Sequence, residues 1–352
     1  MWRTPAIPPK NKMIIVLKPG ISRKLEATVL AEIRKRGYQP HVMRGVARTV
    51  IGAIGDELTH ASLESLVQEF PQAVECVNPI QKRYKLVSRE AHPTDSTVTV
   101  RNQVIGGKKL QVMAGPCSVE SEQQLLATAT AVQAAGATIL RGGAFKPRTS
   151  PYEFQGLGEK GLKLLAKARR ETGLAIITEL LSEAHADLVA EYTDIIQIGA
   201  RNSQNFQLLI AAAKTGKPVL LKRGLSMRIE EWLLAGEYVL ANENPNLLFC
   251  ERGIRTFETY TRNTLDLSTI PIIKKESHCP IVIDPSQGAG RSDLVASLCK
   301  GAVAMGADAL LIEVHPNPAK ALSDSSQQLS LEGFANLMRE LRPLIAAAGR
   351  EF

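Results

Sequence analysis

Five basic residues, each at or shortly after the end of a short apolar segment, are the strongest chemical signal in this sequence. They are Arg141, Lys146, Arg201, Lys222 and Arg252. If the apolar segments are parallel strands, their carboxyl ends meet at one edge and the five cations converge there. Cations at such close range repel one another unless anions lie between them. Because guanidinium groups match phosphate and carboxylate geometry, the pattern indicates a site for small molecules that carry these groups.

Acidic residues at other segment ends could instead form ion pairs with these cations. Glu179, Glu251 and Asp284 occupy such positions, and Ser286 adds a hydroxyl two residues after Asp284. Ion pairs with these carboxylates would make part of the basic cluster structural. Either explanation suits a single strand-end arginine, whereas five cations together favour bound anions.

A second anion site is indicated by the loop after Gly142-Gly143. Its residues offer a guanidinium, two hydroxyls and backbone N–H groups, a suitable set for a phosphate: Lys146, Pro147, Arg148, Thr149 and Ser150. Such residues are common in surface loops, and the position after a glycine pair at a strand end strengthens the signal.

A candidate metal site combines one thiolate and two carboxylates, from Cys117, Glu313 and Asp324. This mixture of soft and hard ligands suits Mn, Fe, Co or Zn. The alternative for Cys117 is a small buried residue in a tight Gly-Pro turn. Gln287, after the segment that ends at Ser286, offers an amide oxygen but not the imidazole nitrogen that such metals favour.

The elements that must position these residues form a repeated pattern of apolar strand, polar turn and amphipathic helix. Eight strands in about 240 residues predict an α/β fold, a (β/α)8 TIM barrel, with its active site at the carboxyl ends of the strands. An open doubly wound sheet is the alternative, although no GxGxxG motif follows an early strand. The expected strands are 110–114, 138–140, 174–178, 194–198, 218–221, 247–250, 281–283 and 309–313.

The residues before the barrel predict a separate small domain. Apolar patterns over 13–81 give the order β-α-β-β-α-β of a ferredoxin-like α+β module, with its second helix over 58–70. The charged, aperiodic segment 82–97 is interpreted as a linker. The barrel region is 98–352, and it opens with a hairpin formed by 98–105 and 109–113 around Gly106-Gly107.

Composition excludes several other classes of protein. Hydrophobic residues make up 44% of the chain, enough for a large core. The net charge of +8 comes without a basic run or interleaved aromatics, so no nucleic-acid partner is expected. No apolar run of about 18 residues and no signal peptide is apparent, which favours a cytoplasmic protein without membrane contact.

The motifs together resemble the type Iβ 3-deoxy-D-arabino-heptulosonate 7-phosphate (DAHP) synthases that carry an N-terminal ferredoxin-like regulatory domain. The resemblance extends over nearly the whole chain. Its most specific stretches are Ala114-Gly115-Pro116-Cys117-Ser118, residues 140–156, Ile196-Gln197-Ile198-Gly199-Ala200-Arg201-Asn202, Leu221-Lys222-Arg223-Gly224 and Cys250-Glu251-Arg252-Gly253.

This resemblance implies condensation of phosphoenolpyruvate with erythrose 4-phosphate, the first step of the shikimate pathway. It implies that the five strand-end cations hold phosphoenolpyruvate, while the loop of residues 146–150 and Asp284 hold the aldose phosphate; Glu179 and Ser286 are also expected to bind substrate. The aldehyde oxygen would be polarised by the metal or by protonated Lys146. The family's metal ligands fall on Cys117, Glu313 and Asp324, with its histidine position taken by Gln287.

Gln287 leaves alternatives open. The amide ligates a divalent metal weakly, or the enzyme is metal-independent, or a diverged enzyme uses a different aldose phosphate in a secondary pathway. A non-catalytic regulator that binds phosphoenolpyruvate or an aromatic amino acid is a further alternative. The intact anion sites argue against that alternative.

The small domain resembles the family's sensor of aromatic amino acids. His41 stands where the family has a ligand-contacting histidine, whereas Met43 replaces an expected serine. The resemblance therefore implies feedback inhibition by Tyr or Phe, and a homotetramer. A domain kept for assembly alone is the alternative.

Overall fold

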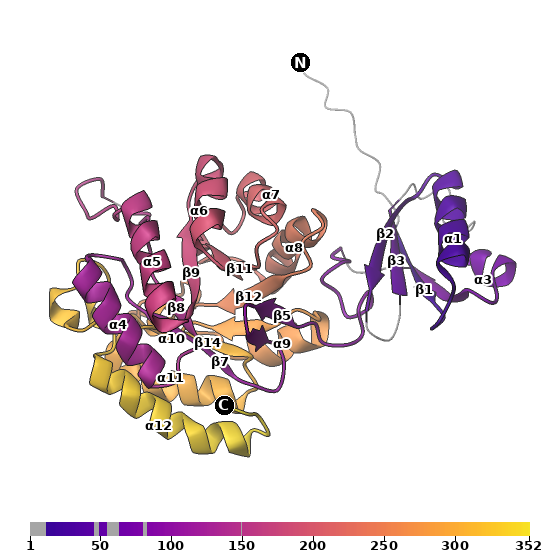
Figure 1. Ribbon diagram of the computed structural model, residues 1–352. Helices are drawn as coiled ribbons and strands as arrows, with labels where there is room; N and C mark the ends of the chain where they lie inside the picture. Colours follow the sequence, from indigo (N-terminus) through magenta and orange to yellow (C-terminus); the bar gives the residue numbers. More distant parts are fainter. Residues whose placement is uncertain (1–11, 46–48, 55–62, 80–82, 149) are drawn as a thin grey trace. The chain divides into compact units, whose positions relative to one another are not determined.

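The structure is a computed structural model that describes residues 12–45, 49–54, 63–79, 83–148 and 150–352. The chain divides into two compact units, Met1–Thr94 and Asp95–Phe352. Each has its own sheet and core (Figure 1).

The first unit contains a four-stranded antiparallel sheet. Its strands run in the order β2-β3-β1-β4, the arrangement of a ferredoxin-like fold that the sequence predicts. Of the second expected helix the structure describes Leu66–Glu69 as α3, and residues 58–62 of that prediction lie outside the described part. The elements are β1 (Lys12–Leu17), α1 (Arg23–Lys35), β2 (Gln39–Arg44), β3 (Thr49–Ile54), α3 (Leu66–Glu69) and β4 (Val74–Pro79).

Both faces of this sheet are apolar. Successive residues of β1 point to opposite faces, and hydrophobic residues occur at both sets of positions. The core shared with α1 includes Met13, Ile15 and Leu17. Ile14 and Val16 lie in a second cluster with Ala91, a residue of the segment predicted as a linker. Residues 83–94 therefore belong to the first unit. They are not an extended connection, because Ala91 packs against the apolar side chains of Ile14 and Val16 and shields them from water.

The second unit is a closed barrel of eight parallel strands, as the sequence predicts. Strand β14 pairs with β7 and closes the circle. The predicted and observed strands agree to within one or two residues. The strands are β7 (Gln111–Gly115), β8 (Ile139–Arg141), β9 (Ala175–Leu180), β10 (Ile195–Ile198), β11 (Val219–Lys222), β12 (Leu247–Glu251), β13 (Ile281–Ile283) and β14 (Ala309–Glu313).

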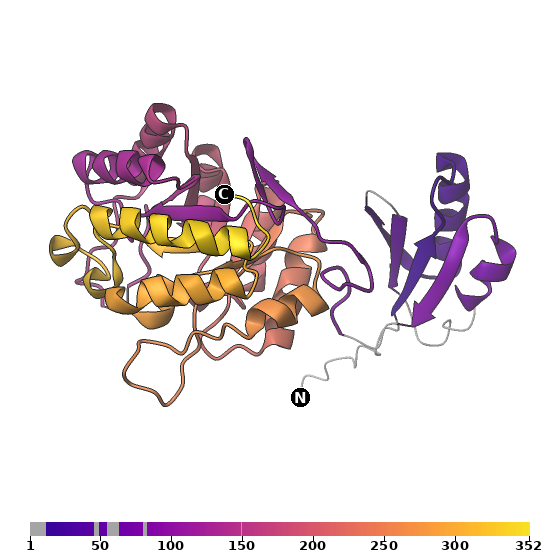
Figure 2. The ribbon, with the colours of Figure 1, turned by 90° about the horizontal axis from the view of Figure 1, so that it is seen from below.

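Helices surround this barrel, and α12 lies alongside α11 in Figure 2. In the described part of the chain, no helix combines the length and apolar character needed to cross a bilayer. The helices are α4 (Glu122–Ala134), α5 (Glu159–Thr172), α6 (Ala186–Tyr192), α7 (Phe206–Lys214), α8 (Ile229–Leu240), α9 (Thr269–Glu276), α10 (Pro285–Ala289), α11 (Ser292–Ala304) and α12 (Leu331–Ala347).

A short hairpin closes the end of the barrel opposite the strand carboxyl ends. It pairs β5 (Val98–Val100) with β6 (Gln103–Ile105), so the predicted hairpin partner 109–113 was wrong. The turn lies at Arg101, which adopts a positive φ of 55°, and the chain then enters the barrel as β7. Hairpin residues share the barrel's interior core, which includes Val98, Val100, Ile105, Met113, Ile139, Leu220 and Leu248.

One aromatic pair joins the barrel wall to a surrounding helix. Phe249 of β12 and Trp232 of α8 are fully buried, with ring centroids 4.9 Å apart at 73°. The pair fills the space left by Gly236, where a Cβ would lie 2.7 Å from Phe249 Cζ. The edge-to-face contact therefore fixes how closely α8 approaches the barrel.

We expect Phe249→Ala to lower the free energy of unfolding of the barrel by about 3–5 kcal/mol, because it removes a buried ring and leaves a cavity. Chemical denaturation followed by tryptophan fluorescence measures the change. Phe257→Ala is the matched control: that ring is 97% exposed, so a change within about 0.5 kcal/mol is expected. Equal losses in the two variants would contradict this assignment of the core.

Candidate functional site

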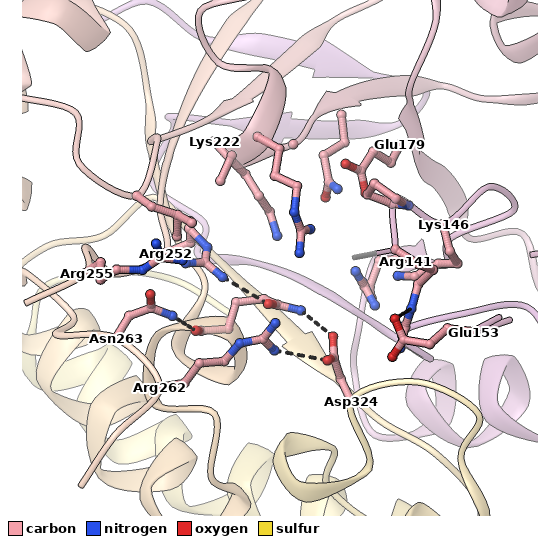
Figure 3. Close-up of a pocket in the computed structure, with 18 residues that line it drawn as sticks. Arg141, Lys146, Glu153, Glu179, Lys222, Arg252, Arg255, Arg262, Asn263 and Asp324 are labelled. Carbon is pink, nitrogen blue, oxygen red and sulfur yellow. Dashed lines mark hydrogen bonds and ion pairs between the residues drawn. The ribbon is translucent and has the colours of Figure 1, made fainter. Parts of the chain in front are cut away.

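A cavity of about 310 Å³ opens where the carboxyl ends of the barrel strands meet. In Figure 3 the charged side chains point inward from several strand ends. Basic residues greatly outnumber Glu153, Glu179 and Asp324, the acidic residues that line it. The lining residues are Arg141, Lys146, Pro147, Arg148, Glu153, Glu179, Gln197, Gly199, Ala200, Arg201, Lys222, Leu225, Arg252, Arg255, Arg262, Asn263, Gln287 and Asp324.

Two of the predicted cations are neutralised by buried carboxylates. Lys222 Nζ lies 2.5 Å from Asp284 Oδ2, and Arg141 Nη1 lies 3.0 Å from Glu313 Oε1. Burial opposes the charge of Arg141, but Glu313, Cys117 and Asp284 together outweigh it and leave the guanidinium pKa raised. Asp284 is fully buried and does not line the cavity, in contrast to its predicted contact with substrate. Its other oxygen accepts a hydrogen bond from the Gln287 backbone N–H at 2.9 Å.

Three other cations that line the cavity have no acidic partner in the described part of the chain: Arg201, Arg252 and Arg255. Burial lowers the pKa of the Arg252 guanidinium, as expected for a cation removed from water. Positive charge without a protein counterion, concentrated around one cavity, attracts anions. This part of the site therefore has the character of a phosphate or carboxylate site.

Lys146 reaches the base of the cavity from the loop after β8. Its Nζ donates a hydrogen bond to the backbone oxygen of Cys117 at 3.1 Å and a second one to Cys117 Sγ, also at 3.1 Å. Burial disfavours its charge, but nearby Cys117, Glu179 and Glu313 outweigh this effect and raise its pKa. A glycine at 143 leaves the necessary room, because a Cβ there would lie 2.8 Å from Lys146 Cδ. Lys146 is thus a protonated ammonium group.

The predicted metal ligands do come together. Single ligand atoms of Cys117, Glu313 and Asp324 all lie within 4.8 Å of one another. Burial, followed by the charge of Glu313, raises the pKa of the Cys117 thiol to about 12. Ser286 supports this group: its hydroxyl accepts a hydrogen bond from Glu313 N at 3.0 Å. Ser286 is buried beneath the cavity and does not line it, in contrast to its predicted contact with substrate.

Gln287 lies between this ligand group and the cations. Its Nε2 donates to Glu313 Oε1 and Asp324 Oδ2, each at 3.0 Å, and its Oε1 accepts from Arg252 Nη2 at 3.0 Å. The opposite amide orientation would place two donors against each other at Arg252 and an oxygen against two carboxylates. The amide therefore presents N–H groups, not a lone pair, to the ligand atoms. Cys117, Glu313 and Asp324 fit a three-ligand metal site, and Gln287 does not fit as a fourth ligand.

Further residues of the site come from the long loop after β12, well beyond the end of the strand in the sequence. Arg262 Nη1 lies 3.0 Å from Asp324 Oδ1, and Arg262 contributes to the lowered pKa of that carboxyl despite its burial. Asn263 Nδ2 donates to the Gln287 backbone oxygen at 2.9 Å. These residues come more than ten positions after the strand, so strand-end reasoning could not find them. Arg255, four residues after the strand, was within reach of that reasoning.

The loop predicted to form the second anion site contributes part of the cavity wall. Pro147 and Arg148 line the cavity, whereas Ser150 does not, and Thr149 lies outside the described residues. The Arg148 guanidinium pairs with Glu153, an acidic residue that the sequence reasoning did not single out.

His41, the predicted regulatory residue, belongs to the first unit. It lies on β2 opposite Gly52 of β3, and it is partly exposed. Met43 lies on the same strand and packs against the second apolar cluster of the sheet. The structure thus places His41 on the sheet of the ferredoxin-like unit.

Comparison with known proteins agrees with this geometry. The "DAHP synthetase I family" model matches residues 92–347, and the "DAHP synthase ferredoxin-like domain" model matches residues 13–82. A phospho-2-dehydro-3-deoxyheptonate aldolase from Thermotoga maritima is 50% identical over 339 residues, which are 96% of this chain and 99% of that protein. A 2-dehydro-3-deoxyphosphooctonate aldolase from Caulobacter vibrioides is 34% identical over 271 residues, covering 70% of this chain and 91% of that protein.

Solved structures give the same result. The crystal structure of the Thermotoga maritima DAHP synthase has a TM-score of 0.77 at 49% identity, covering 97% of this chain and 99% of that chain. A truncated form of that synthase has a TM-score of 0.72 at 49% identity and covers 76% of this chain and 98% of that one. The chain belongs to the DAHP synthetase I family and carries the ferredoxin-like domain of DAHP synthases before its barrel.

Proposed function

We propose that this protein is a DAHP synthase, which condenses phosphoenolpyruvate with erythrose 4-phosphate to give DAHP and inorganic phosphate. The observation that carries the proposal is the cavity in which unneutralised cations adjoin Lys146 and the ligand group Cys117, Glu313 and Asp324. Two phosphorylated substrates need such positive charge, and an aldehyde acceptor needs an electrophilic group beside it. The reaction is the first step of the shikimate pathway.

In this proposal the two substrates occupy different parts of the cavity. Arg201 and Arg252 bind phosphoenolpyruvate, and Arg141 and Lys222 line the same cavity, held in place by their buried carboxylate partners. Arg148 binds the phosphate of the aldose. Glu179 lines the cavity and faces Lys146, so it acts near the reacting groups. Holding both substrates together converts a bimolecular reaction into an effectively unimolecular one.

The carbon–carbon bond forms when C3 of phosphoenolpyruvate attacks the aldehyde carbon. The Lys146 ammonium donates a hydrogen bond to the aldehyde oxygen and supplies the proton as negative charge develops there. Water then adds to C2 and loses a proton to the Lys146 amine, and the C2–O bond breaks with its electron pair leaving on the phosphate. Cations around the cavity stabilise the departing phosphate.

We further propose that Cys117, Glu313 and Asp324 hold a divalent metal, Mn, Fe, Co or Zn, with three protein ligands. Such an ion, when bound, supplies Lewis-acid polarisation of an oxygen in the cavity. This proposal is supported by the three ligand atoms, which all lie within 4.8 Å of one another. Gln287 holds the two carboxylates by hydrogen bonds instead of contributing a ligand atom.

Phosphate release from phosphoenolpyruvate and erythrose 4-phosphate tests the reaction. We expect turnover, and we expect Arg201→Ala to lower kcat/KM by about tenfold or more, because it removes a charged hydrogen bond to substrate. Arg291→Ala, which removes an exposed arginine paired with Asp293, is the control and should leave kcat/KM nearly unchanged. Turnover with a five-carbon aldose phosphate but not with erythrose 4-phosphate would contradict the assigned acceptor.

The Gln287→His variant tests the three-ligand site. A histidine nitrogen replaces the amide N–H groups, so the affinity for Co²⁺ should rise by about tenfold or more. Competition with a chelator measures the affinity, and the thiolate-to-cobalt absorption band reports on Cys117 directly. Gln204→His, on the exposed surface, is the control. An unchanged affinity with Gln287→His would show that position 287 is not adjacent to bound metal.

We propose that the ferredoxin-like domain, residues 13–81, binds Tyr or Phe and transmits feedback inhibition, with His41 among its ligand contacts. The family of this domain and the resemblance of its sequence support the proposal. A homotetramer is proposed on the resemblance alone. Addition of Tyr or Phe to the phosphate-release assay should lower the rate, and His41→Ala should weaken that inhibition. No inhibition by either amino acid would leave assembly as the role of the domain.

A further inference from the structure

The loop between β8 and α5 brings one acidic residue of this chain against the cavity's second anion site. The base of the loop is closed by an antiparallel bridge between Phe145 and Gly156 and by a hydrogen bond from Lys146 N to Gln155 O at 2.9 Å. Phe145 also stacks on His185, with centroids 4.9 Å apart. This closed base holds the two sides of the loop opposite each other.

Within the loop, the Glu153 carboxylate engages Arg148 with both oxygens. Arg148 Nη2 lies 2.8 Å from Oε1, and Arg148 Nε lies 3.3 Å from Oε2. The Ser150 backbone N–H also donates to Oε2 at 3.4 Å. Arg148 and then Ser150 lower the pKa of the Glu153 carboxyl, which is therefore ionised. A guanidinium fork and a backbone N–H are the donors that a phosphate group would use.

We propose that Glu153 occupies the position of the acceptor's phosphate on Arg148 and must be displaced when the aldose phosphate binds. This inference rests on the proposed function, in which Arg148 binds that phosphate. Glu153 is then a specificity-determining residue. The free energy of binding the acceptor depends on how much more strongly these donors bind its phosphate than they bind the Glu153 carboxylate.

The charge of the cavity explains why an internal anion is placed there. Arg148 is mostly covered, with 15% of its side chain exposed, and it shares the cavity with many other cations. Without a counterion it would be repelled by them while the site is empty. Glu153 is more exposed, with 43% of its side chain accessible, and lies on the same loop, so it can leave Arg148 without disturbing a packed core.

Steady-state kinetics of Glu153→Gln test the inference. The amide keeps the size of the side chain and removes its charge, so phosphate no longer competes with a carboxylate. We expect KM for erythrose 4-phosphate to fall about threefold, a modest change typical of exposed ion pairs. KM for phosphoenolpyruvate should stay within about twofold, since that substrate uses other cations. Glu153→Ser, which removes the contact altogether, should behave in the same way.

Matched variants separate this contact from a general change of charge. Glu159→Gln also removes one exposed carboxylate, which pairs with Lys163 at 2.7 Å on α5 and does not line the cavity. Its KM for erythrose 4-phosphate should equal that of the unmodified protein. In Arg148→Ala, the further change Glu153→Gln should give no additional decrease in KM. An unchanged KM with Glu153→Gln, or a decrease that persists without Arg148, would overturn the inference.

A binding experiment distinguishes failure of this inference from failure of the proposed function. Inorganic phosphate is the probe, added with saturating phosphoenolpyruvate so that the other cations are occupied, and the shift it causes in the thermal unfolding temperature needs no turnover. We expect half-maximal stabilisation of Glu153→Gln at about one third of the phosphate concentration required by the unmodified protein. If no variant turns over erythrose 4-phosphate but this difference appears, the function is wrong and the competition is supported. Equal phosphate dependence in both proteins, with normal turnover, contradicts the competition alone.

Discussion

The concentration of positive charge at one end of the barrel is the constraint on which the rest of this structure depends. Cations this close together repel one another, and a folded protein tolerates them only with counterions or ligands. Asp284 and Glu313 supply buried counterions for Lys222 and Arg141. Arg201 has no such partner in the described residues, so its charge is available to a substrate. In the proposed function, the same cluster therefore contains a structural half and a ligand-binding half.

Gln287 joins these two halves in a way that a metal-ligating histidine would not. Through its amide, Arg252 on the cationic side is connected to Glu313 and Asp324 on the acidic side. A metal ion between the carboxylates would compete with the amide N–H groups for the same oxygens. Position 287 is therefore where this chain departs from the pattern of the type Iβ synthases that its sequence resembles.

The barrel strands could be predicted because each is a short apolar run that ends in polar residues, and strand ends in turn locate Arg141, Lys146 and Arg252. Contacts made by residues far from a strand end could not be predicted. Arg262 reaches the site only through a long loop, and the pairing of Arg148 with Glu153 depends on how a loop closes on itself. The burial of Asp284 could not be predicted either, because the sequence gives its position at the end of a strand but not the direction of its side chain.

Equilibrium binding of phosphoenolpyruvate and of pyruvate, measured by isothermal titration calorimetry, tests the central claim most directly. The two molecules share a three-carbon skeleton and a carboxylate, and only the first carries a phosphate for the unneutralised cations. If these cations hold the phosphate, phosphoenolpyruvate should bind about 100-fold more tightly or better, as the loss of charged hydrogen bonds requires. Similar affinities for both molecules would show that the positive charge of the cavity serves another purpose.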